Sequence, residues 1–197
     1  MGNYYKGYKM ANFELAHKIT SDCEGGYVND PHDAGGETIF GIARNMWKDL
    51  PLWRIVDDYK KAVGDLSERE NRTQLEKLCL GNGEFVKLKN AFYKAQFWDK
   101  LKGDELHSQA IANNVYDFAV NAGVKQSVRS LQRCLNIEAD GIFGNESLKA
   151  CNNALEKEVN NAFCKAREQF YKDLVTRKPA NEKFLKGWLG RVKRFYV

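Results

Sequence analysis

The chain of 197 residues is poor in proline and histidine, with three of each, and its five cysteines follow no zinc-binding spacing. Scarce proline argues against long disordered linkers. No stretch is apolar enough to span a bilayer. Cysteines in this pattern are expected to be mostly buried thiols, with one structural disulfide as the alternative. These absences predict a folded protein without a metal site and without stable membrane insertion.

Positive charge exceeds negative charge only slightly, with 31 lysines and arginines against 26 acidic residues. A mild basic excess favours acidic partners such as cell-wall polymers, nucleic acid or anionic lipid. Nucleic-acid binders, however, cluster arginine and lysine around a reading helix, whereas the charges here are dispersed. We therefore expect no nucleic-acid partner.

The first residues are polar and rich in tyrosine, and they lack the apolar core of a secretory signal. Retention in the cell, export by another route and removal of a leader each fit this start. The sequence therefore predicts synthesis in the cytoplasm without a visible signal peptide.

Apolar residues recur at helical spacing along most of the chain. Turn residues and a short β-branched run interrupt this pattern at about residues 27–42. The expected helices cover residues 11–23, 84–98, 109–122, 126–135, about 153–175 and about 184–192, and another begins at the capping-box sequence Ser67–Glu70. The helix over 109–122 is expected to be capped by Ser108 and ended by Gly123. Inward-facing residues of the other helices are expected to include Leu15, Leu75, Leu78 and Leu155. The predicted fold is all-α, with a small irregular β-like flap at about residues 27–42.

Residues 24–42 hold the chemistry that the sequence shows most clearly. Glu24 is followed by two glycines, Asp33 comes nine residues later, and Thr38 follows five residues beyond that. Two carboxyl groups that converge on one cleft are what acid-assisted cleavage of a sugar–sugar bond requires. Glu24 is expected at the C-terminal tip of the first helix, where the helix dipole favours the protonated carboxyl.

Five ordered blocks of the sequence resemble glycoside hydrolase family 108, the lysozyme-like N-acetylmuramidases once labelled secretion activators. The blocks are residues 24–42, 93–98, 117–123, 131–144 and 184–192. The resemblance covers roughly residues 11–195. It implies a lysozyme-like fold and cleavage of the β-1,4 bond between N-acetylmuramic acid and N-acetylglucosamine in peptidoglycan. The fourth block resembles a predicted peptidoglycan-binding region.

The resemblance makes Glu24 the general acid, Asp33 the second carboxylate and Thr38 the residue that holds a water. Each also has an ordinary alternative, namely a helix-end cap, a turn aspartate and a strand residue. Asp117 and Asn121, one helical turn apart, are expected to bond sugar acetamido groups or else to satisfy backbone groups. The expected substrate-binding residues are Tyr27, Gly35, Gly36, Tyr93, Asp117 and Asn121.

We expect an N-terminal extension over residues 1–10, a lysozyme-like catalytic region over 11–120, and a predicted peptidoglycan-binding helical region over 121–197 packed on it in one compact domain. No metal or cofactor is expected, because two carboxyl groups and water suffice. The expected partner is the peptidoglycan glycan strand in the periplasm or cell wall, reached through a secretion or holin system. The alternatives are a non-catalytic peptidoglycan-binding accessory protein for secretion or phage release, and a lytic transglycosylase.

Overall fold

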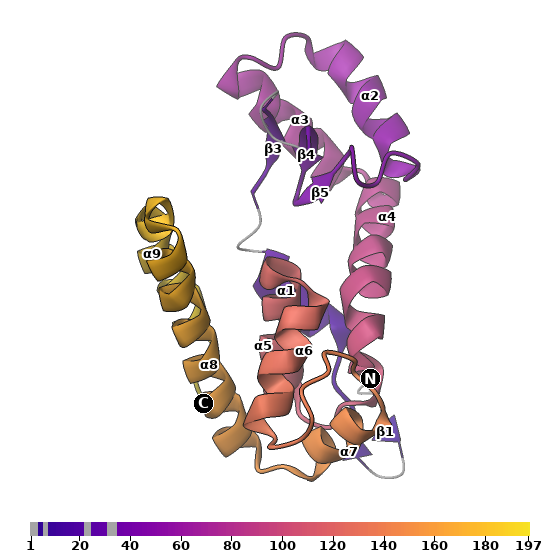
Figure 1. Cartoon of the computed structure of the whole chain (residues 1–197). Helices are drawn as coiled ribbons and strands as arrows, with labels where there is room; N and C mark the ends of the chain where they lie inside the picture. Colours follow the sequence, from indigo (N-terminus) through magenta and orange to yellow (C-terminus); the bar gives the residue numbers. More distant parts are fainter. Residues whose placement is uncertain (1–3, 6–7, 22–24, 31–34) are drawn as a thin grey trace. The chain divides into compact units, whose positions relative to one another are not determined.

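The computed structural model describes residues 4–5, 8–21, 25–30 and 35–197, so Glu24 and Asp33 lie outside the described residues. The chain divides into two compact units. We call Ser21–Tyr93 the flap unit, and Met1–Thr20 with Lys94–Val197 the helical unit. The described residues are mostly helical and include a small antiparallel sheet (Figure 1), which confirms the predicted fold class.

The flap unit combines a three-stranded antiparallel sheet, in the order β3-β4-β5, with three helices. Its elements are β3 (Tyr27–Asn29), β4 (Glu37–Ile39), β5 (Ile42–Ala43), α2 (Leu52–Val63), α3 (Arg69–Gly81) and α4 (Gly83–Tyr93). Successive strand residues face opposite sides of a sheet, so Tyr27, Ile39 and Ile42 share the buried face. They pack in a core that includes Val56, Leu75 and Phe85.

Two sequence expectations in the flap unit need correction. The capping box at Ser67 is not formed, because the Ser67 hydroxyl donates to Asp65 Oδ2 at 2.7 Å and α3 starts at Arg69 without a side-chain cap. Helix α2 was not singled out from the sequence; its N-cap residue is Pro51, and it too has no side-chain cap. The capping signal predicted at Ser67 therefore failed, while Leu75 is buried as the periodicity predicted and Leu78 is 36% exposed.

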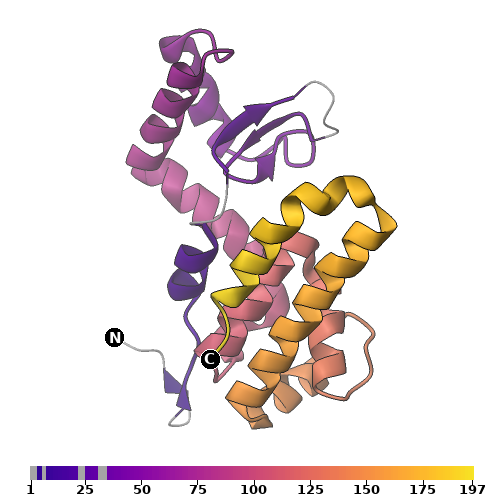
Figure 2. The same ribbon diagram turned by 90° about the vertical axis from the view of Figure 1, so that its left-hand side faces the viewer.

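The helical unit is built around α5, whose central residues are completely buried. Its elements are β1 (Tyr4–Tyr5), β2 (Tyr8–Lys9), α1 (Phe13–Ser21), which ends one residue inside the flap unit, η1 (Lys94–Trp98), η2 (Asp99–Leu101), η3 (Gly103–Glu105), α5 (Gln109–Ala122), α6 (Val124–Cys134), α7 (Asn145–Asn153), α8 (Glu156–Arg177), η4 (Pro179–Asn181) and α9 (Glu182–Lys193). As predicted, Ser108 Oγ caps α5 by accepting from Ile111 N at 3.0 Å, and Gly123, at φ 91°, ends it. Helices α8 and α9 lie side by side as an antiparallel hairpin (Figure 2).

The buried face of α1 differs from the predicted one. Leu15 is 53% exposed, and the helix instead buries Phe13, Ala16, His17 and Thr20. The His17 ring stacks on Phe13 at 5.1 Å and lies 2.9 Å from the Tyr116 hydroxyl, which allows a polar ring to be buried. Apolar residues alone therefore predicted the wrong buried face of α1.

Two long helices predicted from periodicity have different bounds in the structure. The segment predicted as one helix over 84–98 becomes α4 followed by a π-helical turn, η1. The segment predicted as a helix over 153–175 starts only at Glu156, because α7 ends at Asn153. Leu155, counted on the inner side of that helix, is 67% exposed. Among the described cysteines, residues 79, 134, 151 and 164 are free thiols.

Candidate functional site

Thr38 lies in the middle of β4, on the sheet face opposite the core. In the register of the sheet it stands between Val28 of β3 and Ala43 of β5. Val28 is exposed, and Thr38 and Ala43 are partly exposed. Among the described residues, the Thr38 hydroxyl makes only a long contact, 3.5 Å, to the Gly36 carbonyl oxygen. Thr38 is therefore placed where its hydroxyl can meet a ligand or a water on the outer face of the flap.

Glu37, which no residue pattern in the sequence marks as functional, fixes the opposite side of the same strand. Its buried carboxylate forms an ion pair with Arg44, whose Nε lies 2.7 Å away, and accepts from Lys60 Nζ at 2.7 Å. The Tyr27 hydroxyl donates to the same carboxylate. Burial and this bond to Glu37 raise the pKa of the Tyr27 phenol well above its usual value. A neutral phenol and two cations thus hold β4 from its inner side.

Arg44 extends this cluster to α2. It donates to both carboxylate oxygens of Asp57, at 2.7 and 3.1 Å, and its guanidinium lies 4.4 Å from the centre of the Trp53 ring. The hydrogen bonds from Arg44 hold the pKa of the Asp57 carboxyl below its usual value. A bidentate pair of this kind fixes direction as well as distance. The strand that carries Thr38 is therefore held to α2 by a network of paired charges.

Tyr93 holds the tight turn between β4 and β5. Phe40 and Gly41 both have positive φ, 44° and 77°, as a two-residue hairpin turn of type I′ requires. The Tyr93 hydroxyl donates to the Phe40 carbonyl oxygen at 2.6 Å, and the Phe40 ring contacts Phe85 at 6.0 Å. Because the rings of Tyr93 and Tyr27 are both buried, we treat these two tyrosines as residues that position the flap.

Gly26 and Gly36 of the flap stand where an added Cβ atom would collide with a neighbouring side chain. Gly36 has φ +62°, and an added Cβ would lie 2.6 Å from Asn45 Nδ2. Gly35 accepts from Asn45 N through its carbonyl oxygen at 3.2 Å. A Cβ on Gly26 would meet the Glu76 carboxylate at 2.0 Å, and Glu76 Oε1 accepts from Tyr27 N at 2.7 Å. The backbone of the flap is therefore built with close approaches that side chains would block.

Asp117 lies in the helical unit and is completely buried. Its carboxylate accepts from Arg167 Nη2 at 2.5 Å, from Arg191 Nη2 at 2.8 Å and from Thr20 Oγ1 at 3.2 Å. Arg167 is completely buried too, and it also donates to Asn114 Oδ1 at 2.5 Å. This arrangement makes Asp117 a residue that positions the last turn of α1, four residues before Glu24 in the chain.

Asn121, one turn further along α5, is exposed. Its Oδ1 accepts from the Tyr171 hydroxyl at 2.6 Å, so the amide plane is fixed and its N–H donors remain for a partner. The acetamido contact of Asn121 stays a prediction, whereas Asp117 is buried and does not face solvent.

The predicted residues fall into two groups. Tyr27, Gly35, Gly36, Thr38 and Tyr93 share the flap unit, and Asp117 and Asn121 share the helical unit. Glu24 and Asp33 lie outside the described residues. Within the described part of the chain, no three His, Cys, Asp or Glu side chains converge as ligands for a metal ion. The described helices include none with the length and apolar character needed to cross a membrane.

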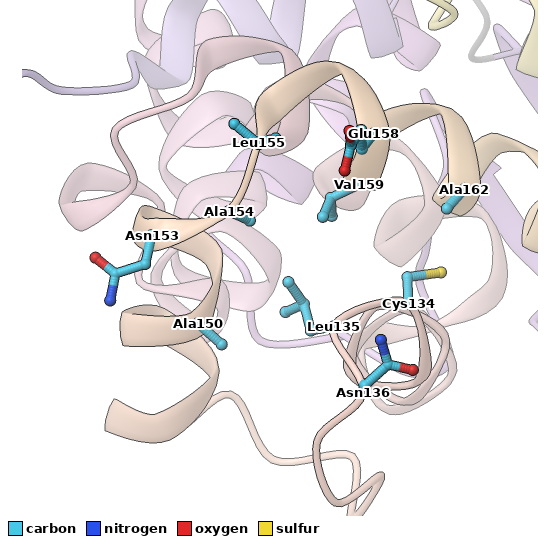
Figure 3. Close-up of a pocket in the computed structure, with 10 residues that line it drawn as sticks. All are labelled: Cys134, Leu135, Asn136, Ala150, Asn153, Ala154, Leu155, Glu158, Val159 and Ala162. Carbon is cyan, nitrogen blue, oxygen red and sulfur yellow. The ribbon is translucent and has the colours of Figure 1, made fainter.

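A hollow of about 480 Å³ opens where α6, α7 and α8 meet (Figure 3). Its ten lining residues are mainly aliphatic, with Leu135 and Val159 near the centre and Asn136, Asn153 and Glu158 among them. None of the ten is aromatic. Since the ring faces that stack on sugars are missing there, this hollow is a poor match to a glycan.

The fold and the flap define a mostly α-helical, lysozyme-like protein. Residues 17–123 match glycosyl hydrolase 108, and residues 126–193 match a predicted peptidoglycan domain. The chain belongs to the glycosyl hydrolase 108 family, as its motifs predicted. These matches indicate a peptidoglycan-related role, as a glycoside hydrolase or as an accessory protein.

Among solved structures, the chain is similar to that of Brucella abortus SagA. The two sequences are 27% identical, the match covers 93% of this chain and 90% of that chain, and the TM-score is 0.61. A comparison with curated proteins found no match. The similarity therefore extends over both family regions and not over the hydrolase region alone.

Proposed function

We propose that the protein hydrolyses the β-1,4 bond between N-acetylmuramic acid and N-acetylglucosamine in peptidoglycan, with Glu24 as the general acid. The observation that carries this proposal is the family match over residues 17–123, which includes the complete set Glu24, Asp33 and Thr38. In support, Thr38 lies on the open face of a flap whose inner face is held by buried charges.

The proposed reaction needs no group beyond these side chains and water. Glu24 protonates the glycosidic oxygen as it leaves, and positive charge develops on the sugar ring that remains. Asp33 stabilises that charge or orients the attacking water, and the Thr38 hydroxyl holds the water. The water that adds to the anomeric carbon loses one proton, and Glu24 regains a proton from that water or from solvent, which completes the cycle. Removing the proton donor should cost about 10²- to 10⁴-fold in rate.

The test is mass analysis of fragments released from purified peptidoglycan by the wild-type protein and by Glu24→Gln. Hydrolysis gives fragments that carry an added water, whereas a lytic transglycosylase gives anhydro fragments. The expected result is hydrolysis by the wild type and almost none by Glu24→Gln. The control is Glu14→Gln, which changes an exposed glutamate on α1. Clearance of sacculi by Glu24→Gln at close to the wild-type rate would contradict the acid assignment.

A second candidate function is that of a non-catalytic accessory protein that binds peptidoglycan during secretion or phage release. The match of residues 126–193 to a predicted peptidoglycan domain favours it. It predicts that the wild-type protein binds sacculi and releases no fragments. The same mass analysis therefore separates the two functions.

A further inference from the structure

The outer surface of the α8–α9 hairpin carries aromatic rings that the proposed chemistry does not use. Phe184 and Trp188 stand one turn apart on α9, with ring centres 5.7 Å apart. Phe184 is 48% exposed and Trp188 is partly exposed. The two helices pack on each other and lie side by side in Figure 2.

Tyr171 of α8 connects this aromatic pair to Asn121. The buried Tyr171 ring stacks on Trp188, with ring centres 5.1 Å apart and planes inclined by 23°. Its hydroxyl donates to Asn121 Oδ1 at 2.6 Å. One rigid tyrosine therefore orients both an aromatic face and an amide whose N–H donors remain available on the surface.

Gly187 is a second and independent observation on the same helix. Glycine inside a helix destabilises it relative to alanine, yet a Cβ added at Gly187 would meet nothing within 4 Å. Packing of the described residues thus gives no reason for this glycine. It lies three residues after Phe184 and next to Trp188. Because glycine has no side chain, the helix surface beside the two rings is open to a ligand.

The charge around the rings is positive. Lys183 Nζ lies 4.9 Å from the centre of the Phe184 ring, and Lys186 is exposed on the same helix. Stem peptides of peptidoglycan carry carboxylates, which such lysines attract. The ring faces are negatively polarised, and one face of a pyranose ring presents positively polarised C–H groups. The rings, the amide donors and the lysines thus match the three kinds of group on a muropeptide strand.

We propose that Phe184, Gly187, Trp188 and Asn121 form a binding subsite for the N-acetylated glycan strand of peptidoglycan. The rings stack on sugar faces, Gly187 gives the strand room, and the Asn121 amide donates to an acetamido carbonyl. This proposal rests on the proposed function for the identity of the polymer. It places a glycan contact on α9, within the residues that match the predicted peptidoglycan domain.

The test measures binding to purified sacculi by co-sedimentation, and to the soluble β-1,4-linked N-acetylglucosamine tetramer by calorimetry. Every variant is made on the Glu24→Gln chain, so that the glycan stays intact. Phe184→Ala should bind about tenfold more weakly, in line with the loss of one stacking ring. Gly187→Ala should also bind more weakly, although its melting temperature should rise by about 2–4 °C because alanine favours the helix.

Gly187→Ala keeps the test decisive if Phe184→Ala fails to fold. The matched control is Leu155→Ala, which removes an exposed apolar side chain at the hollow of Figure 3. Unchanged binding by Phe184→Ala and Gly187→Ala would overturn the subsite. An equal loss in Leu155→Ala would overturn it too, because the effect would then not be specific to α9.

Turnover by chains that retain Glu24 is a separate readout. If the wild type releases no fragments while Phe184→Ala weakens binding, hydrolysis fails and the subsite stands. If the wild type hydrolyses peptidoglycan while both α9 variants bind normally, the subsite fails and hydrolysis stands.

Discussion

Replacing Asp117 by asparagine should lower the free energy of unfolding by about 3–5 kcal/mol, because breaking a buried ion pair leaves an uncompensated buried charge. Asn114 retains its bond to Arg167 in this variant, but the only carboxylate bonded to Arg167 among the described residues is lost. The substitution keeps the size and shape of the side chain. The change therefore isolates charge from packing.

The magnitude follows from the exposure of the two arginines. Arg167 is completely buried, and its guanidinium would lose the charge 2.5 Å away. Arg191 is 11% exposed and would regain only part of its hydration. The asparagine oxygen can still accept one hydrogen bond, which limits the loss. For a chain of this size each kcal/mol lowers the melting temperature by about 2–4 °C, so the fall should be about 6–20 °C.

The assay is urea unfolding followed by circular dichroism, together with thermal melts at the same pH. The matched control is Asp173→Asn, at an exposed aspartate of α8 whose carboxylate accepts from Gln169 Nε2 at 2.7 Å. The control should change stability by no more than about 0.5 kcal/mol. If Asp117→Asn differs from that control by less than about 1 kcal/mol, the burial argument is refuted.

Three further predictions concern the flap unit. Glu37→Gln should speed amide hydrogen exchange in β4 and lower turnover, because Arg44 and Lys60 lose a buried counter-charge; unchanged exchange would contradict this. Asp57 has a lowered pKa, so its pair with Arg44 stabilises the protein above about pH 4 and is lost as pH falls through the lowered value. Asp57 is 42% exposed, so the wild type should lose less than about 1 kcal/mol more free energy of unfolding than Asp57→Asn between pH 6 and pH 3. A larger extra loss, or no extra loss, would count against this pair. Burial raises the pKa of the Cys79 thiol to about 12, so at pH 8 it should react with a thiol reagent only after unfolding in urea; rapid labelling of the native protein would show the burial to be wrong.

Local signals in the sequence predicted the centre of the fold well. Ser108 and Gly123 bound α5 as their residue types indicate, since a serine side chain satisfies a free backbone N–H and glycine tolerates positive φ. The turn residues of the flap likewise predicted a small β element where β3, β4 and β5 are found. Both features depend on contacts between residues close in sequence.

The contacts that fix the candidate site join residues far apart in sequence, and periodicity cannot identify their partners. Asp117 was expected at the substrate because it shares a helix face with Asn121, but its arginines follow 50 and 74 residues later. Glu37 was passed over because its role depends on Lys60, 23 residues away. Strand alternation was the available signal, since it places Glu37 on the side opposite Thr38.

The buried polar groups around Asp117 explain why the two family matches are not two separate bodies. Asn114 and Asp117 lie within the hydrolase match, whereas Arg167 and Arg191 lie within the predicted peptidoglycan domain. Neither set can be buried alone without leaving charges unpaired. Because Thr20 bonds the same carboxylate as Arg191, one side chain holds both the last turn of α1 and the helix that carries the aromatic subsite. Asp117 therefore joins the last turn of α1 to α9, two elements that belong to different family matches.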